Sequence, residues 1–467
     1  MRKTLLVSAG LLCLVGLVSL GCSQTAAPVE PSFPELKLTP RDRVLILAPH
    51  PDDEVLACGG IIQKAVAAKV PLRVVFFTYG DGNEWSFLIY RKRPVVRTKS
   101  VKAMGQVRHD EALLAAKVLG LTPDQLTFLG YPDFRTQDLW TSHWGVRPPV
   151  KGFLTRATAV PYPNAFRPGA PYKGEEVLTD LETILRSFKP TRVFVSHPGD
   201  HNGDHRSLYL FTRVALWDLQ DEMNPSVHPY LVRYPDWPKP HGRLLESGLT
   251  PPAQLATACD WVSESLTPDE VSLKDAALKM HRSQYQVSRG YLESFVRRNE
   301  LFGQPPPVTF EAASTTGYLS QSASTIQPET VEQLTDQERA AFVGVVGRSV
   351  RMDGNALVIT TTLSRPLGQA VGASVYVFGY RKDRPFARMP KLHVRFGVVG
   401  QEVFDQADVL SDGTVQITRS PHEMTLRIPL EALGNPDRVL TSTGTYTGKV
   451  PLDWTSWLTV ELPVRVH

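Results

Sequence analysis

Apolar and polar residues alternate along the chain with a period that changes several times, and each change marks a predicted element. The first apolar run of strand length is Val44 to Ala48, followed by a helical pattern over 54–69 and a β-rich run over 71–78. A strand, a helix and a strand in such close succession indicate a pair of parallel strands joined by a helical crossover.

The same alternation continues toward the middle of the chain. The pattern predicts helices at 107–119, 175–188, 206–218 and 268–302, and strands at 126–129 and 193–196. It therefore predicts an α/β fold, a Rossmann-like and mostly parallel sheet with helices on both faces. The stretch 131–173 shows no clear period and is typical of a binding loop or lid.

The pattern shifts to short strands beyond residue 308. Three consecutive prolines within 303–307 end the preceding element and favour a stiff link. After them, short runs rich in Val, Thr, Tyr and Phe are separated by Gly and Asp or Asn turns. We expect an α/β domain over 41–302, a Pro-rich linker over 303–307 and an all-β sandwich domain over 308–467.

The N-terminus has the features of an export signal. Two basic residues precede the uncharged apolar run Leu5 to Leu20, and Gly21-Cys22 follows. Small residues before a cysteine resemble the bacterial lipoprotein processing site, which implies a signal peptide over 1–22 and acylation of Cys22. A Pro-, Ser- and Ala-rich tether would span 23–40. We expect a lipid-anchored protein of the cell envelope, in the outer membrane if the cell has one; simple secretion is the alternative.

Composition narrows the choice of partner. The 51 Lys and Arg residues nearly balance the 47 Asp and Glu residues, leaving a net charge of +4. Because a protein that binds the phosphate backbone of nucleic acid needs a concentrated basic face, we expect no nucleic acid partner. With Cys13 removed in the signal and Cys22 acylated, only Cys58 and Cys259 would remain for redox chemistry, so the predicted state is two buried thiols, with one bridge as the alternative.

The candidate chemistry lies where two predicted strands end. His50-Pro51-Asp52-Asp53-Glu54 follows the first strand, and a His- and Asp-rich run over 197–205 follows the strand at 193–196. Parallel strands bring their carboxyl ends to one edge of a sheet, where ligands bind. We expect the two clusters to converge, supply three ligands to a cation such as Zn²⁺ and leave one position for water, as in catalytic sites.

These residues resemble the PIG-L/LmbE-like superfamily of zinc-dependent de-N-acetylases, which act on N-acetylglucosaminyl compounds. The resemblance covers about 40–302. It rests on the HPDDE run, Thr78-Tyr79-Gly80-Asp81, Arg108 with Glu111, Leu129-Gly130-Tyr131-Pro132-Asp133, Asp204-His205, His281 to Gln284 and Arg298-Asn299-Glu300. It implies a hydrolase that removes an N-acetyl group from an N-acetylglucosamine-type sugar or glycan.

The resemblance also implies roles for single residues. His50, Asp53 and His205 would hold Zn²⁺, and Asp52 would be the general base. Arg108 and Asp133 match positions that face the sugar or order the pocket. Asp81 follows a strand at the same sheet edge, where it would form a pocket wall or only a turn.

One position departs from the family pattern. Members of the glucosaminyl-thiol pathway have His three residues before the metal-binding His, where this chain has Asn202. An amide can donate a hydrogen bond to an oxyanion but cannot deliver a proton. The acid that protonates the leaving amine is then Asp52, His201 or His241, with His197 and His201 as the alternative orienting residues.

Two other classes of function stay open at this stage. The metal site would also suit hydrolysis of another amide or of an ester, and a non-catalytic glycan-binding lipoprotein with an inactive site is the third reading. The region over 424–434 vaguely resembles carbohydrate-binding sandwiches, and a spacer or oligomerisation role for the β domain is an equal alternative.

Overall fold

The structure is a computed structural model that describes residues 33–82, 98–310 and 334–463, apart from 412 and 449. The predicted export signal over 1–22, Cys22 and the first part of the tether lie outside the described residues. No helix within the described ranges is both long and apolar enough to cross a membrane.

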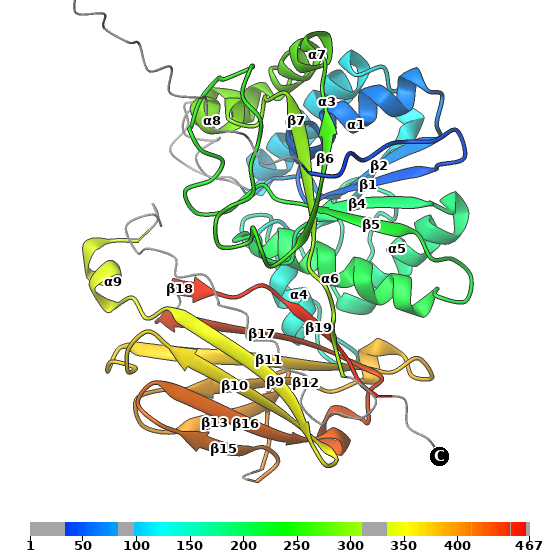
Figure 1. Cartoon of the computed structure of the whole chain (residues 1–467). Helices are drawn as coiled ribbons and strands as arrows, with labels where there is room; N and C mark the ends of the chain where they lie inside the picture. Colours follow the sequence, from blue (N-terminus) through cyan, green and yellow to red (C-terminus); the bar gives the residue numbers. More distant parts are fainter. Residues whose placement is uncertain (1–32, 83–97, 311–333, 412, 449, 464–467) are drawn as a thin grey trace, which may run out of the picture. The chain divides into compact units, whose positions relative to one another are not determined.

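A seven-stranded sheet forms the centre of the N-terminal part, in the order β3-β2-β1-β4-β5-β7-β6 (Figure 1). All neighbours from β3 to β5 are parallel, whereas β7 is antiparallel to β5 and β6. The strands are β1 (Val44–Ala48), β2 (Leu72–Thr78), β3 (Leu126–Tyr131), β4 (Arg192–Ser196), β5 (Ser226–Tyr230), β6 (Asp260–Ser265) and β7 (Asn299–Gln304). The prediction of a mostly parallel sheet is confirmed.

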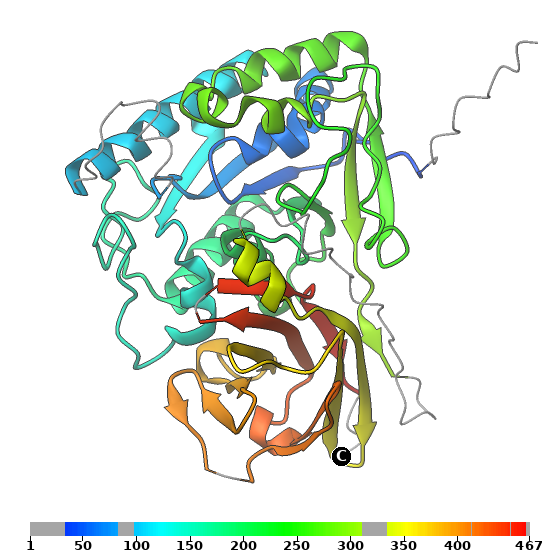
Figure 2. The same cartoon turned by 90° about the vertical axis from the view of Figure 1, so that its left-hand side faces the viewer.

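Helices cover both faces of this sheet, as the two views show (Figures 1 and 2). Alternate residues of β1 point to opposite cores: Val44 and Ile46 join one hydrophobic cluster, and Leu45 and Leu47 join the other. The helices are α1 (Asp53–Ala67), α3 (Thr98–Val118), α4 (Thr136–Ser142), α5 (Gly174–Phe188), α6 (Gly203–Asp218), α7 (Pro268–Leu278) and α8 (Arg282–Glu293). Because β1 is covered on both faces, it has no polar side, and this explains why its sequence is apolar throughout.

One expected helix is only partly present. The pattern over 268–302 predicts helix throughout, but helix ends at Glu293 and residues from Asn299 form strand β7. The prediction is wrong for 299–302. Leu301 and Phe302 are buried beneath the sheet's helices, and Phe302 pairs with Tyr230 of β5, so sheet pairing overrides the local pattern.

The C-terminal part consists of two β-sheets with a hydrophobic core between them. One sheet has the order β15-β16-β10-β9, and the other β14-β13-β12-β11-β17-β19-β8 with β18 paired to β17. The strands are β8 (Val308–Thr309), β9 (Val345–Asp353), β10 (Ala356–Leu363), β11 (Val371–Tyr380), β12 (Lys391–Phe396), β13 (Gln401–Asp405), β14 (Asp408–Val409), β15 (Gln416–Arg419), β16 (Glu423–Pro429), β17 (Arg438–Thr447), β18 (Val450–Trp454) and β19 (Leu458–Glu461). The short helix α9 (Asp336–Ala341) lies between β8 and β9 in the chain. The expected sandwich is confirmed.

The two parts share a hydrophobic cluster, and residues 33–467 form one compact unit. Trp140 and Trp144, at and just after α4, are fully buried, and the Trp140 ring stacks on Phe386 with centroids 5.2 Å apart. Trp457 lies 6.2 Å from Trp140 in an edge-on arrangement. These aromatic side chains fix the C-terminal sheets against α4 and α6.

Candidate metal centre and active-site cavity

The turn after β1 carries the first group of site residues. The His50 backbone N–H donates to Asp53 Oδ2 at 3.0 Å, which closes the turn at the start of α1. Asp52 has a φ of 134°, a conformation that residues other than glycine rarely adopt. Its backbone N–H donates to Glu54 Oε2 at 2.9 Å. A strained residue held in this way is typical of functional sites.

The loop between β4 and α6 carries the second group. Asn202 caps α6, since its Oδ1 accepts from the Asp204 N–H at 2.8 Å. The Asp200 carboxylate accepts from the backbone N–H groups of Asn202, at 2.9 Å, and Arg233, at 2.8 Å. These bonds fix the loop that leads into His205.

The two groups meet because β1 and β4 are parallel neighbours. His50 Nδ1, His205 Nε2 and Asp53 Oδ2 form a triangle in which all three separations are 3.3 Å. A tetrahedral ion with ligand bonds of about 2.0 Å spaces its ligand atoms about 3.3 Å apart. Asp53 Oδ1 is buried with no hydrogen-bond partner among the described residues. The donor set and its spacing therefore fit a divalent metal ion.

Carboxylates hold both imidazole rings from behind. His50 Nε2 lies 3.1 Å from Asp133 Oδ1 and 3.2 Å from Asp204 Oδ2, and His205 Nδ1 lies 3.0 Å from Asp200 Oδ2. A ring that donates its N–H to these oxygens keeps a lone pair on the nitrogen that faces the triangle. Such partners orient ligand histidines and raise their basicity.

Asp52 lines the cavity next to the triangle and faces Arg108. Arg108 Nη2 lies 3.4 Å from Asp52 Oδ2, and the guanidinium also donates to the carbonyls of Gly80, at 2.8 Å, and Pro51, at 2.5 Å. Burial raises the pKa of Asp52, and the Arg108 charge opposes that rise. Gly80 has a φ of +63°, and a Cβ there would lie 2.1 Å from Arg108 Nη1, so the glycine makes room for this arginine.

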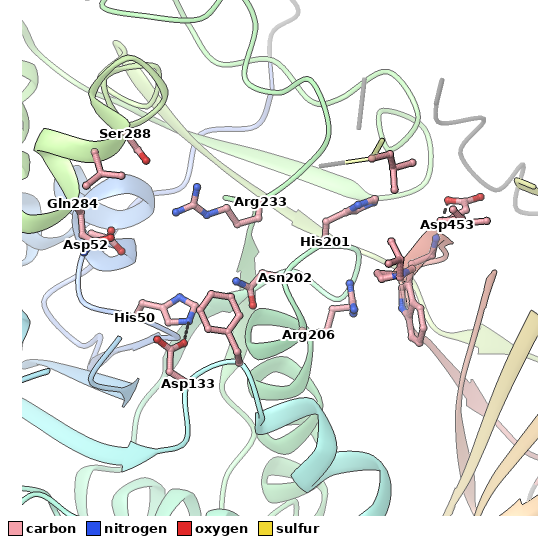
Figure 3. Close-up of a pocket in the computed structure, with 18 of the residues that line it drawn as sticks. His50, Asp52, Asp133, His201, Asn202, Arg206, Arg233, Gln284, Ser288 and Asp453 are labelled. Carbon is pink, nitrogen blue, oxygen red and sulfur yellow. Dashed lines mark hydrogen bonds and ion pairs between the residues drawn. The ribbon is translucent and has the colours of Figure 1, made fainter. Parts of the chain in front are cut away.

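His50 of the triangle lines a cavity of about 540 Å³, a size typical of small-molecule sites. His50, Asp52 and Asp133 lie at one end and Asp453 lies at the other, with Asn202, His201, Arg206 and Arg233 between them (Figure 3). The remaining lining residues are Arg108, Phe134, Gly203, Gln284, Val287, Ser288, Leu334, Val450, Pro451, Leu452 and Trp454. Phe134 is 56% exposed, an open aromatic face near Asp133.

The candidate histidines separate into three settings. His201 lines the cavity, where burial and the Arg206 charge lower its pKa to about 4. His197 is buried, accepts from the Gly199 N–H at 2.9 Å and lies 3.4 Å from Cys259 Sγ, so it orients the loop. His241 is exposed, 3.9 Å from Asp236, and is not among the residues that line the cavity.

Asp81 also lies away from the cavity lining. Its carboxylate is buried and accepts a short hydrogen bond from the Tyr162 hydroxyl. Burial, together with the neighbouring charge of Asp133, raises the pKa of Asp81 to about 7. In this structure Asp81 supports the wall behind Asp133 rather than forming the cavity surface.

The sequence pattern did not reveal several residues that build the site. Arg233 follows β5 and Arg206 lies on α6; both line the cavity. His281 Nε2 lies 2.9 Å from Glu54 Oε1, and the Ser283 N–H and hydroxyl donate to Glu111 at 2.9 and 2.7 Å. The motif residues Glu111 and His281 to Gln284 thus anchor α8 beside Asp52. The DH pair was the usable signal for Arg206, which directly follows it.

Comparison with known protein families gives one match that includes both motif groups. Residues 45–216 match the family model described as GlcNAc-PI de-N-acetylase, PIG-L. A comparison with curated proteins gives no match.

Several solved structures are similar to part of the chain. One is an N,N'-diacetylchitobiose deacetylase from Pyrococcus horikoshii in complex with an inhibitor, 22% identical over 56% of this chain and 84% of its own, with a TM-score of 0.35. A zinc-inhibited form of teicoplanin deacetylase Orf2 is 18% identical over 54% and 88%, with a TM-score of 0.35. The 4-carboxy-2-hydroxymuconate hydratase GalB from Pseudomonas putida KT2440 is 17% identical over 58% and 100%, with a TM-score of 0.33. Likenesses at this level carry no argument about activity.

Proposed function

Since residues 45–216 match the family model of the PIG-L de-N-acetylases, we propose that this protein is a zinc-dependent hydrolase that removes the N-acetyl group from an N-acetylglucosamine-type sugar or glycoconjugate. One observation carries the proposal: His50, Asp53 and His205 form a 3.3 Å triangle, and His50 of this triangle lines the same cavity as Asp52. A metal site with a carboxylate beside it is what amide hydrolysis by activated water requires.

Each residue at this end of the cavity then has a role. A divalent ion held by the triangle would supply Lewis-acid polarisation of the amide carbonyl and acidify a water molecule. Asp52 accepts the proton of the attacking water, and Arg108 holds the Asp52 carboxylate in place. Asn202, in the cavity wall, offers an amide N–H to the oxygen on which negative charge develops.

The structure favours Asp52 as the group that returns the proton to the leaving amine. His201 faces the cavity, but its pKa is about 4, so its ring is neutral at pH 7. A neutral imidazole ring is a poor proton donor to the leaving amine. His241 does not line the cavity. Asp52 becomes protonated when water attacks, so one carboxylate performs both transfers.

The test is acetate release by the purified protein together with its metal content. We expect release of acetate from N-acetylglucosamine or its oligomers, about one zinc per chain, loss of activity with a chelator and recovery on adding Zn²⁺. Acetyl esters and acyl amides without a sugar serve as controls for the alternative hydrolase. Protein that holds its metal yet releases acetate from none of the N-acetylated sugars would contradict the proposal.

The cellular setting is a separate part of the proposal and rests on residues 1–22 alone. The apolar run before Cys22 supports export and lipid attachment at the cell envelope, with secretion as the alternative. Expression of the full chain and of Cys22→Ala, followed by membrane fractionation, separates the two. Membrane association that needs Cys22 supports the anchor, and equal release of both proteins contradicts it.

A further inference from the structure

The C-terminal part forms one wall of the cavity. Residues of β18 line the side opposite the metal triangle: Val450, Pro451, Leu452, Asp453 and Trp454. In both views β18 lies on the side of the C-terminal sheets that faces the α/β part (Figures 1 and 2). The cavity is therefore not contained within the family-matched region, which ends at residue 216.

Trp454 is held in a defined position in this wall. It pairs with Gly444 of β17, where a Cβ would lie 2.5 Å from the indole Cε3, so only glycine leaves space for the ring. The Arg206 guanidinium lies over the indole, 4.7 Å from the ring centroid. Such a pair combines an apolar ring with a cation at one surface.

Neighbouring contacts fix the backbone of this wall. Asp453 accepts from the backbone N–H groups of Val345, at 2.7 Å, and Trp454, at 2.8 Å. The Trp457 N–H donates to the carbonyl of Pro198 at 3.2 Å, which joins the wall to the loop that carries Asp200 and Asn202. The wall is thus preorganised relative to the metal triangle.

Two hydrogen-bond donors in this wall have no partner. Trp454 Nε1 and Arg206 Nε are buried, and within the described ranges neither finds an acceptor. The other two guanidinium nitrogens of Arg206 donate hydrogen bonds: Nη1 to the carbonyl of Asp200 at 2.8 Å and Nη2 to Gln137 Oε1 at 3.0 Å. Buried donors without acceptors are costly, and both belong to side chains that line the cavity.

We propose that Trp454 and Arg206, with β18, form a distal subsite that binds a second saccharide unit joined to the N-acetylated sugar. A pyranose ring offers apolar C–H faces to the indole and hydroxyl groups to the Arg206 and Asp453 side chains that line the cavity, which matches the mixed surface of this wall. Figure 3 places Asp453 of β18 beyond Asn202, His201 and Arg206 as seen from His50 and Asp52. The substrate is therefore at least a disaccharide unit, and the β part contributes directly to substrate selection.

This inference rests on the proposed function, and the experiment that tests it compares kcat/KM for two substrates as a ratio. We measure kcat/KM of the full chain for N-acetylglucosamine and for its β-1,4-linked dimer and trimer. In the wild type we expect the dimer to be preferred by at least about tenfold, the effect of about 1.4 kcal/mol. In Trp454→Ala the ratio falls toward one. Because both substrates meet the same active molecules, the ratio does not depend on how much of the variant folds.

Two further variants sharpen the result. Gly444→Ala keeps the indole but displaces it, so the preference for the dimer should also fall. Tyr446→Ala is the matched control: it removes an aromatic ring from β17, outside the cavity lining, and should keep the wild-type ratio. Calorimetric binding of the dimer and the monomer to metal-free protein should show the same preference and the same loss in Trp454→Ala.

The outcomes separate the two proposals. Equal kcat/KM for monomer and dimer in the wild type overturns the distal subsite and leaves the deacetylase in place. A preference that survives Trp454→Ala also overturns it. Tighter binding of the dimer without any acetate release supports the subsite and overturns the proposed reaction.

Discussion

The two ends of the cavity are built in different ways. The metal end consists of short polar runs that directly follow β1 and β4, and its three ligand atoms come from residues close to strand ends. The distal end combines Arg206 of α6 with β18, which follows the run after β4 by about 250 residues and reaches the cavity because aromatic packing docks the C-terminal sheets onto α4 and α6.

This difference separates chemistry from selection. At the metal end every ligand is fixed by local hydrogen bonds such as those of Asp200 and Asn202, so its geometry follows from the sheet topology. At the distal end the wall depends on contacts between parts of the chain. Substitutions at the first end should abolish turnover, whereas those at the second should change which substrate is preferred.

The largest effect is expected from His205→Ala. Removing one of three ligands should eliminate stoichiometric metal binding and reduce kcat by more than about 10⁴-fold, because metal and activated water are lost together. Metal analysis and acetate release on the same sample check this. His241→Ala, at an exposed histidine outside the cavity lining, is the matched control and should keep both properties. Full metal content in His205→Ala would break the assignment of the metal end.

Asp52→Asn should leave the metal bound but lower kcat by about 10²–10⁴-fold, the usual contribution of a general acid–base group. The amide is close in shape to the carboxylate but cannot accept the proton of the attacking water. Steady-state kinetics and metal content are measured together. Wild-type turnover in the zinc-loaded variant would remove Asp52 from the mechanism without affecting the triangle.

Asp200→Asn should weaken metal binding by about 10–100-fold while the bound form stays active. The carboxylate supports His205 Nδ1 at 3.0 Å, and an amide can present its NH₂ group there instead of an acceptor. Titration with a competing chelator gives the affinity. An affinity unchanged from the wild type would show that the ring is oriented by its packing alone.

The smallest effect concerns the docking that positions the distal end. Lys391 is fully buried beneath the rings of Trp144 and Phe386, and burial lowers its pKa to about 7 although Asp405 opposes this. Between pH 7 and the unfolded value near 10.5 the unfolded chain binds the additional proton. The free energy of unfolding should therefore rise with pH in this window, by up to about 1.4 kcal/mol per unit relative to Lys391→Met. Parallel pH profiles from urea unfolding would contradict the lowered pKa.

Sequence reasoning was sufficient for the metal end and insufficient for the rest. Apolar runs followed by His and Asp clusters located the two groups, parallel topology predicted that they meet, and the family resemblance singled out His50, Asp53 and His205 as the ligands. Arg233 follows a strand that the periodicity did not reveal. The pattern predicts helix over 299–302, but burial against β5, rather than the local pattern, makes this segment part of strand β7. Which strand of a distant sandwich would face the cavity depends on docking that no local pattern encodes.

The bond from the Trp457 N–H to the Pro198 carbonyl has a practical consequence for engineering. A side chain at Gly199 would also collide with Ser456 Oγ, so the loop between β4 and α6 and the C-terminal strands are complementary in shape where they meet. A protein truncated near residue 304 would expose this contact surface, and the aromatic rings around it, to solvent. Transferring the α/β part to another protein therefore requires a new surface that packs against the loop between β4 and α6, not merely a new linker.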